Sequence, residues 1–281
     1  MTRQKVWFIT GSGSGFGRIW ADAALARGDK VAATDRNPEK LSALVSAYGD
    51  SVMTPPLDVT DRPSVFRVVN EAHRHFERLD VIISNAGYGY EGALEEVDFN
   101  EYRANFDTNV FGTVSVIQAA LPLLRAQRSG HIITLSSIGG LIGFPAGGSY
   151  GATKFAIEGL TESLAGDVAS FGIKVTMLEP GSFATGFKSS MRAAPKMAEY
   201  DVVREAAAAN FRSELSGDPK ATAGAILRLV DSGKPPLRLI LGSHPLPLVR
   251  QVYVKRLETW AEWADVSNAA QSPSNAQTRL T

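Results

Sequence analysis

The stretch that decides the fold is Thr10-Gly11-Ser12-Gly13-Ser14-Gly15-Phe16-Gly17, between an apolar run at 6–10 and an amphipathic run at 16–27. We predict a strand for the first run and a helix for the second. Glycine lets the backbone turn sharply and lets a pyrophosphate approach, and the helix start offers unpaired N–H groups. A glycine-rich turn in this context indicates dinucleotide binding. A P-loop is disfavoured, because no Lys-Ser or Lys-Thr follows the last glycine.

Beyond this turn, apolar β-type runs alternate with amphipathic segments along the chain. The runs lack polar alternation, which is typical of strands covered on both faces in a parallel sheet. Further strands are predicted at 30–34, 51–54, 81–84, 131–136, 174–178 and 237–241, and further helices begin at 38, 61, 98 and 149. We therefore expect α/β architecture, a Rossmann-like doubly wound parallel sheet in a single domain over residues 1–265.

Two segments depart from this pattern. Over about 185–210 the sheet pattern lapses, and apolar side chains are scattered among Lys and Arg. The segment is either a surface helix and loop or a small lid over a substrate pocket. We favour the lid, because it directly follows a strand's carboxyl end, where ligands bind in such sheets. Residues 266–281 are rich in Ser, Asn, Gln and Ala, and we expect a disordered tail.

Composition narrows the function classes. The 281 residues carry 29 Lys+Arg and 29 Asp+Glu, and this balance argues against nucleic-acid binding by a basic field. There is no cysteine, which excludes disulfides, thiol nucleophiles and cysteine-ligated metals and is compatible with a cytoplasmic location. No uninterrupted apolar run reaches the roughly 20 residues of a membrane span. His73 and His75 point apart on a predicted helix, so we expect no metal site.

Asp35 and Arg36 end the second predicted strand, and Asp35 lies 18 residues after Gly17. A carboxylate at this distance accepts hydrogen bonds from an adenosine 2′-OH and repels a 2′-phosphate. The guanidinium of Arg36 favours the opposite choice, because it suits phosphate. We favour NAD over NADP, because the acid occupies the ribose position itself.

Tyr150 and Lys154 lie four residues apart, on one face of a predicted helix, and Ser137 ends a predicted strand 13 residues upstream. A Tyr and a Lys at this spacing are common on surface helices, so the neighbouring motifs decide. With these three residues and the glycine turn, Asp58-Val59, Asn85-Ala86-Gly87, Asn109 and Pro180-Gly181, the chain resembles the short-chain dehydrogenase/reductase family over about residues 5–185. The run from Ser136 to Pro145 is similar to the branch with 17β-hydroxysteroid and retinol dehydrogenases and bacterial carbonyl reductases.

The resemblance implies a role for each of four catalytic residues. Tyr150 would be the general acid in reduction and the general base in oxidation. Lys154 would lower the pKa of that phenol, ordinarily about 10, and would bind the nicotinamide ribose. Ser137 would hold the substrate oxygen. Asn109 would bend its long helix and hold a water in a proton relay to Lys154.

The resemblance also implies a cofactor site and a substrate pocket. Asp58 would meet the adenine, and Thr185 the nicotinamide carboxamide. The implied cofactor residues are Thr10, Gly11, Ser12, Ser14, Gly15, Phe16, Gly17, Asp35, Arg36, Asp58, Val59, Asn85, Ala86, Gly87, Tyr150, Lys154, Pro180, Gly181, Phe183 and Thr185. The proposed pocket wall is apolar: Tyr88, Phe144, Phe183, Phe187 and Met191.

These residues predict an oxidoreductase that moves a hydride between NAD(P)(H) and an apolar secondary alcohol or ketone. One alternative is a catalytically silent dinucleotide sensor, although a sensor needs no proton donor such as Tyr150. A sugar-nucleotide epimerase shares the Tyr–Lys pair but needs a larger C-terminal domain. The resemblance further implies a homodimer or homotetramer formed through the long helices after Asp98 and Ser149.

Two charged stretches are interpreted as structural rather than catalytic. Glu95-Glu96 is interpreted as the start of the long helix, where acidic groups suit the helix dipole. The stretch from Arg250 to Trp263, with Lys255-Arg256, is either a lipid-facing helix or a packed surface helix. We favour the packed helix, because acidic residues dilute its positive charge.

Overall fold

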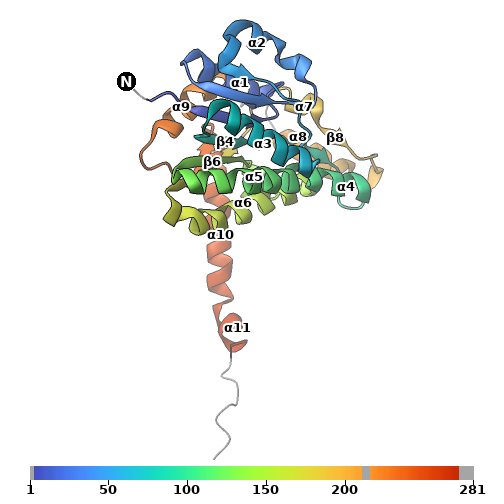
Figure 1. The fold of residues 1–281 in the computed structure, drawn as a ribbon. Helices are drawn as coiled ribbons and strands as arrows, with labels where there is room; N and C mark the ends of the chain where they lie inside the picture. The colour runs from blue at the N-terminus through green and yellow to red at the C-terminus, as the bar shows by residue number, and fades with distance from the viewer. Residues whose placement is uncertain (1–2, 211–215, 272–281) are drawn as a thin grey trace, which may run out of the picture.

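The computed structural model describes residues 3–210 and 216–271, and a seven-stranded sheet lies at its centre (Figure 1). The strand order is β3-β2-β1-β4-β6-β7-β9, and all six pairings are parallel. The chain thus winds outward in both directions from β1 and β4, as predicted for a doubly wound sheet. The strands are β1 (Val6–Thr10), β2 (Lys30–Thr34), β3 (Val52–Met53), β4 (Val81–Ser84), β6 (Gly130–Leu135), β7 (Ile173–Pro180) and β9 (Arg238–Leu241).

Helices cover both faces of the sheet. Successive strand residues enter opposite cores: Phe8 and Ile82 pack into one apolar cluster, Ile9 and Ile83 into the other. This explains why the strands lack polar alternation. The first cluster is covered by α3 (Arg62–Phe76), α5 (Gly112–Gln127) and α6 (Gly148–Val168), and the second by α1 (Gly15–Ala26), α2 (Ser42–Tyr48) and α9 (Thr222–Asp231).

The helix predicted from Asp98 onward is real but interrupted. Asp98 caps α4 (Phe99–Phe106) by accepting hydrogen bonds from the N–H groups of Asn100 and Glu101 at 2.9 and 3.0 Å. A π-helical turn over Asp107–Phe111 then joins α4 to α5. The combined run, Phe99–Gln127, is long and apolar enough to cross a membrane, but 56% of its most apolar part is buried within the protein, as in a core helix.

The segment predicted as a lid has a defined structure against the body. It contains α7 (Phe187–Ser190), β8 (Arg192–Ala193) and α8 (Asp201–Asn210), and β8 pairs in parallel with β5 (Tyr90–Glu91). Glu96 is buried beneath it and accepts hydrogen bonds from the N–H groups of Ala93 and Met197, each at 2.7 Å. The interpretation of Glu96 as a helix-start acid was therefore wrong, because its carboxylate joins the lid to the 93–97 loop.

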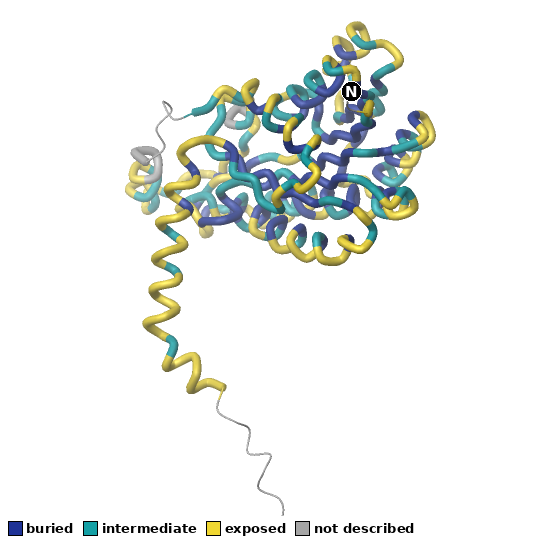
Figure 2. The backbone as a smooth tube through the Cα atoms, turned by 90° about the vertical axis from the view of Figure 1, so that its left-hand side faces the viewer, coloured by how far each residue is buried: buried dark blue, intermediate teal, exposed yellow. Residues whose placement is uncertain are grey.

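The C-terminal part also differs from expectation. Helix α10 (Pro245–Glu262) leaves the body and α11 (Ala264–Ala269) continues it outward (Figure 1). Most of their surface is exposed, in contrast to the buried centre of the body (Figure 2). The packed-surface prediction thus holds only for the base of α10. The tail predicted to be disordered from residue 266 begins within α11, and residues 272–281 lie outside the described residues.

Candidate active site

The glycine turn connects β1 to α1, as predicted. Gly11 and Gly15 have φ of +68° and +56°, a backbone conformation that side chains disfavour. Gly17 lies so close to the turn that a Cβ there would come within 2.4 Å of the Gly11 carbonyl oxygen. Ser14 occupies the N-cap of α1 and its hydroxyl makes no capping bond. The first-turn N–H groups of α1 have no acceptor within the helix, so this turn fits a pyrophosphate.

Asp35 lies beside the glycine turn. Its carboxylate accepts hydrogen bonds from the N–H groups of Gly13, at 3.1 Å, and Asn37, at 3.0 Å. Arg36 is exposed next to it. The carboxylate therefore stands at the β2 end, beside the glycine turn, which is where an adenosine ribose is held in folds of this type. These residues fit a nicotinamide dinucleotide.

A second group of residues ties the turn to the end of β4. Thr10 accepts hydrogen bonds through Oγ1 from the N–H groups of Asn85 and Ala86, each at 3.0 Å. Asn85 donates from Nδ2 to the carbonyls of Thr10, at 2.8 Å, and Gly11, at 3.1 Å. These hydrogen bonds of Thr10 and Asn85 thus hold the glycine turn, which we call the dinucleotide cradle, against the end of β4. Ser12 is likewise internal, since its hydroxyl donates to the Ile9 carbonyl at 2.9 Å.

Asp58 and Val59, the pair predicted to lie near the adenine, have different surroundings in the structure. Asp58 is exposed, and its Oδ1 accepts bonds from the N–H of Thr60 at 2.9 Å and the Thr60 hydroxyl at 2.8 Å. Val59 is buried against Gly112, where a Cβ would come within 2.7 Å of the valine side chain. The Asp58 carboxylate therefore stabilises the turn in which it lies.

The loop after β7 completes the cradle from the opposite side. Gly181 follows Pro180, and a Cβ on Gly181 would come within 2.4 Å of Pro245. The Phe183 ring meets the Phe16 ring edge-on, with centroids 5.3 Å apart. The Thr185 side chain lies 4.0 Å from where a Gly15 Cβ would be. Residues predicted from two distant motifs, the glycine turn and the loop after β7, therefore lie side by side.

The three catalytic candidates converge where β6 and α6 meet. Ser137 follows β6, and the pKa of Tyr150, in the first turn of α6, is affected by a hydrogen bond to Ser137. The Lys154 ammonium lies 5.5 Å from the centre of the Tyr150 ring and donates to the Leu135 carbonyl at 2.7 Å. Ser137 Oγ also accepts the Gly139 N–H at 3.1 Å, which orients the serine.

Burial controls the protonation of this group. Burial raises the pKa of Tyr150 to about 12, opposed by its hydrogen bond with Ser137. Burial lowers the pKa of Lys154 to about 8, opposed by the charge of Glu158. The phenol therefore keeps its proton at neutral pH. The lowering of the phenol pKa by the Lys154 ammonium, which the family resemblance implies, stays a prediction.

Asn109 lies in the π-helical turn, the bend expected of it. Its Nδ2 donates to the Tyr88 carbonyl at 2.9 Å and to Thr153 Oγ1 at 3.1 Å, and its Oδ1 accepts the Tyr88 N–H at 3.0 Å. A Cβ on Gly87 would come within 2.8 Å of this Oδ1. The asparagine therefore joins the loop after β4 to the catalytic helix. Its role in a water relay stays a prediction.

The apolar wall is partly assembled. The Phe187 ring lies 5.5 Å from the Tyr150 ring, and Met191 packs so close to Gly89 that a Cβ there would approach its Cγ within 2.6 Å. The Arg192 guanidinium lies over the Tyr88 ring at 4.8 Å. Phe144 belongs to the partly exposed loop before α6, and no contact with Tyr150 supports its assignment.

Sequence reasoning missed several residues behind the site. Thr153 accepts a hydrogen bond from Asn109, as described above. Glu158, one turn after Lys154, and Glu179 are buried, and Arg238 contacts them at 3.1 and 3.4 Å. Burial, with the charge of Glu158, raises the pKa of Glu179 to about 8. A single sequence gives no periodic pattern that would reveal a buried carboxylate, although it does show Glu179 directly before Pro180-Gly181.

Comparison with known proteins agrees with this geometry. The sequence profile of the family described as short chain dehydrogenase matches residues 5–196. The chain belongs to the short-chain dehydrogenase/reductase family. As a member it is an oxidoreductase that uses a nicotinamide dinucleotide. The chain is 42% identical to "Oxidoreductase BOA17" of Botryotinia fuckeliana over 95% of its own length and 99% of the relative's.

Other members of the family are similar over most of their length. A "3-ketodihydrosphingosine reductase" of Bacteroides thetaiotaomicron is 35% identical over 89% of this chain and 91% of the relative. A solved short-chain dehydrogenase from Streptomyces avermitilis superposes with a TM-score of 0.89, at 37% identity, over 97% of this chain and all of that one. An alcohol dehydrogenase from Thermococcus sibiricus, solved with 5-hydroxy-NADP, superposes with a TM-score of 0.73 at 25% identity. The match covers 86% of this chain and 98% of that one.

Proposed function

We propose that this short-chain dehydrogenase/reductase reduces an apolar ketone to a secondary alcohol, with Tyr150 as the proton donor. The observation that carries the proposal is the convergence of Ser137, Tyr150 and Lys154 where β6 and α6 meet, with the Lys154 ammonium 5.5 Å from the centre of the Tyr150 ring. Reduction of a carbonyl requires a proton for the nascent alkoxide. The Tyr150 phenol, whose pKa is raised by burial, is protonated at neutral pH and can supply that proton.

Each catalytic residue has one task in this reaction. Ser137 donates a hydrogen bond to the ketone oxygen and orients it toward Tyr150. The Tyr150 O–H gives its proton to that oxygen as negative charge develops there. Lys154, with a pKa of about 8, is charged at neutral pH and stabilises the resulting phenolate. When bound, the nicotinamide supplies the hydride.

The remaining assignments support a dinucleotide in the cradle between the glycine turn and Thr185. The carboxylate of Asp35 favours a 2′-OH over a 2′-phosphate, so we propose that NADH is preferred to NADPH. The family member from Thermococcus sibiricus was solved with an NADP derivative, and it is only 25% identical. Cofactor choice therefore rests on Asp35 of this chain.

An apolar substrate is supported by the residues beside Tyr150. Phe187 contacts its ring and Met191 covers Gly89, so the lid presents apolar surface to the reacting group. The reductase from Bacteroides thetaiotaomicron is named for a keto group, which agrees with reduction of a ketone. We propose location in the cytoplasm, with which the absence of cysteine is compatible. We also propose association of two or four copies through the long helices, as the family resemblance implies.

The test is a panel of 2-ketones with increasing alkyl length, assayed with NADH and with NADPH by loss of nicotinamide absorbance. We expect kcat/KM to rise with chain length, because apolar surface is removed from water. Short polar ketones serve as the control. Normal NADH binding with no turnover of any ketone would instead identify a dinucleotide sensor.

A further inference from the structure

Two buried glutamates, which we call the carboxyl pair, lie behind the catalytic lysine. Glu158 follows Lys154 by four residues on α6, so the two side chains lie on one face of the helix, one turn apart. Glu179 lies near the end of β7. Glu158 and Glu179 leave only 4% and 1% of their surface exposed. The proposed catalytic steps assign no task to either of them.

Gly140 shows how closely Glu158 packs beside the catalytic loop. This glycine lies in the short helical turn that begins directly after Ser137. A Cβ on Gly140 would come within 3.0 Å of both Glu158 Cγ and the Lys154 carbonyl oxygen, and within 2.7 Å of Ser136 Oγ. Glu158 and the backbone of Lys154 therefore pack against the same glycine, in the loop that carries Ser137.

The carboxyl pair holds one proton. Among the described residues, no third group donates a hydrogen bond to the four oxygens of Glu158 and Glu179. The two carboxyl groups hydrogen-bond to each other, which requires a proton on one of them. Burial and the charge of Glu158 raise the pKa of Glu179 to about 8, so Glu179 keeps that proton at neutral pH. The negative charge of the pair therefore lies on Glu158, one turn from Lys154.

Arg238 faces the carboxyl pair from β9. Its guanidinium lies 3.1 Å from Glu158 Oε2 and 3.4 Å from Glu179 Oε1. The same guanidinium lies 3.2 Å from Glu162 Oε2, and the Glu162 side chain is 61% exposed. Arg238 thus joins the buried pair to the surface, while Lys154 faces Glu158 from the catalytic side.

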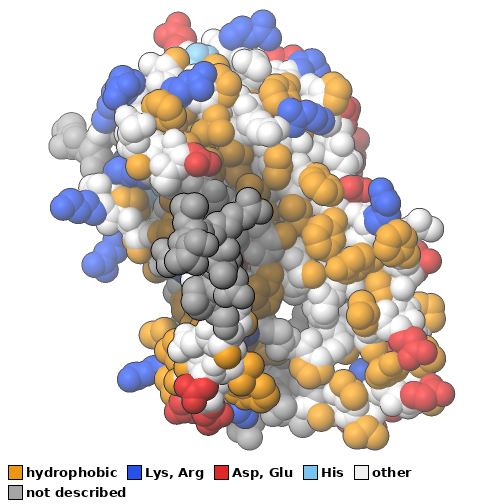
Figure 3. Space-filling model, turned by 90° about the horizontal axis from the view of Figure 1, so that it is seen from below, with side chains coloured by type: hydrophobic (Ala, Val, Ile, Leu, Met, Phe, Trp, Pro, Cys, Tyr) orange, Lys and Arg blue, Asp and Glu red, His pale blue; other side chains and the backbone are white. Residues whose placement is uncertain are grey.

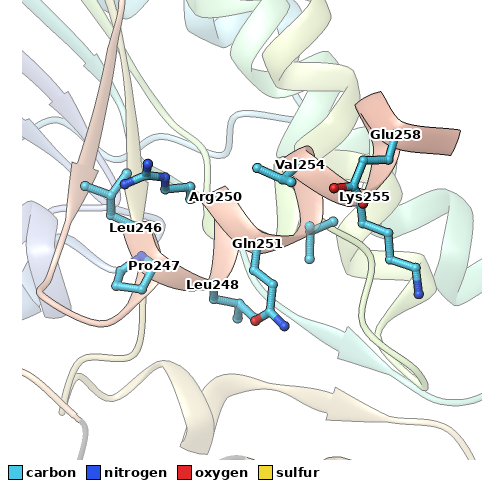
Figure 4. Close-up of a pocket in the computed structure, with 9 residues that line it drawn as sticks. Leu246, Pro247, Leu248, Arg250, Gln251, Val254, Lys255 and Glu258 are labelled. Atoms are coloured by element: carbon cyan, nitrogen blue, oxygen red, sulfur yellow. The ribbon is translucent and has the colours of Figure 1, made fainter. Parts of the chain in front are cut away.

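The base of α10 packs beside Glu179. Ile240, the register partner of Glu179, packs against the apolar cluster that contains Val249. Arg256 donates to the Leu141 carbonyl at 2.9 Å. Figure 3 views the end of the molecule at which α10 projects, and hydrophobic side chains cover much of it. Within the described part of the chain, no ion pair joins α10 to the carboxyl pair. Three other charged side chains of α10 line a hollow of about 1020 Å³ beside that helix (Figure 4): Arg250, Lys255 and Glu258.

The Lys154 ammonium needs a nearby negative charge. Lys154 is only 5% exposed, and its ammonium donates to the Leu135 carbonyl at 2.7 Å, a partner that has no charge. Burial away from water favours the neutral amine. Burial accordingly lowers the pKa of Lys154 to about 8, and the charge of Glu158 opposes this effect. Glu158 thus supplies the compensating charge.

We propose that Glu158 is a positioning residue for catalysis: its buried charge keeps Lys154 protonated at neutral pH, and Glu179 and Arg238 hold that charge in place. Glu158 acts through Lys154 alone. The inference rests on the proposed function, because a charged Lys154 stabilises the phenolate that Tyr150 becomes after it gives up its proton.

The test follows the titration of Lys154 itself by NMR. In the full-length protein labelled with ¹³C-lysine, the Cε signal reports the charge of each ammonium, and Lys154→Met identifies the signal of Lys154. We expect Glu158→Gln to lower the titration midpoint of Lys154 by about one pH unit, because a unit charge is lost one helical turn away. Glu179→Gln is the matched control, equally buried but replacing the carboxyl that carries the proton, and should leave the midpoint at its wild-type value. An unchanged midpoint in Glu158→Gln, or equal falls in the two variants, would overturn the proposal.

Ketone reduction gives a second measurement. The alkaline fall of kcat/KM should begin at a lower pH in Glu158→Gln, by the same shift as the Lys154 midpoint, and should not move in Glu179→Gln. Glu158→Asp keeps the charge and should keep the wild-type midpoint, so it also serves if Glu158→Gln does not fold. A midpoint lowered by about one unit in Glu158→Asp would overturn the proposal. A wild-type protein that reduces no ketone contradicts the proposed function, whereas the Lys154 midpoint decides this inference without turnover.

Discussion

Glu96 accepts a hydrogen bond from the Met197 N–H at 2.7 Å and forms an ion pair with Arg204, so one buried carboxylate joins the lid to the body. Glu96 and Met197 are 101 positions apart in the sequence. The bond from Met197 is the main reason that the pKa of Glu96 is lowered, which keeps the carboxylate charged. The position of the lid, which holds the Phe187 ring against the Tyr150 ring, therefore depends on a group outside the catalytic motifs.

Glu96→Gln should loosen the lid, because the amide loses the ionic contact with Arg204 and offers a poorer acceptor to Met197. We expect KM for an apolar ketone to rise several-fold and the melting temperature to fall. The matched control is Glu95→Gln, since Glu95 is exposed and accepts a bond from Tyr200 at 2.6 Å. Equal effects of the two variants would show that Glu96 does not hold the lid.

Tyr150→Phe should remove the proton donor and keep the ring that contacts Phe187. We expect kcat for ketone reduction to fall by about 10²–10⁴-fold, the usual contribution of general acid–base catalysis. NADH binding, followed by fluorescence, should stay within two-fold of the wild type. Activity near the wild-type level would reject Tyr150 as the general acid.

Asp35→Ala should change the cofactor preference, because the carboxylate that repels a 2′-phosphate is lost while Arg36 remains. We expect the ratio of kcat/KM with NADPH to that with NADH to rise at least ten-fold. Asp58→Ala is the control, since its carboxylate bonds within its own turn. If the ratio does not move, Asp35 does not contact the adenosine ribose.

Gly17→Ala should disrupt the dinucleotide cradle, because its Cβ would come within 2.4 Å of the Gly11 carbonyl oxygen. We expect NADH affinity to fall at least ten-fold and thermal stability to decrease. Gly159→Ala is the matched control on α6, where the added Cβ meets open space. Alanine in a helix is favoured over glycine by about 1 kcal/mol, so this control should keep or gain stability.

His131 gives a pH dependence of stability. Burial, with the nearby charge of Lys174, lowers the pKa of His131 to about 3 from 6.5. Below pH 6.5 the unfolded chain binds a proton that the folded protein excludes, so this residue makes stability fall as pH decreases toward 3. Its slope is at most about 1.4 kcal/mol per pH unit. Urea unfolding of wild type and His131→Gln between pH 7 and 5 measures it, and identical slopes would contradict the assignment.

Much of the fold followed from local pattern. The runs at 6–10, 30–34 and 81–84 became strands with the predicted bounds, because uninterrupted apolar β-type residues suit only a sheet covered on both faces. Asp61 capped α3 and Asp98 capped α4, since short acidic side chains satisfy first-turn N–H groups. The motif residues of the glycine turn, Ser137 and Tyr150 also came from spacing and family resemblance.

The sequence by itself determined which segments are strands and helices and which residues carry chemistry, because these depend on periodicity and short motifs. Only the tertiary structure decided that Tyr150 is enclosed, that Glu96 anchors the lid, and that α10 leaves the body. Each of these depends on contacts between residues tens of positions apart. Burial and charge pairing arise from such long-range contacts, and no local pattern records them.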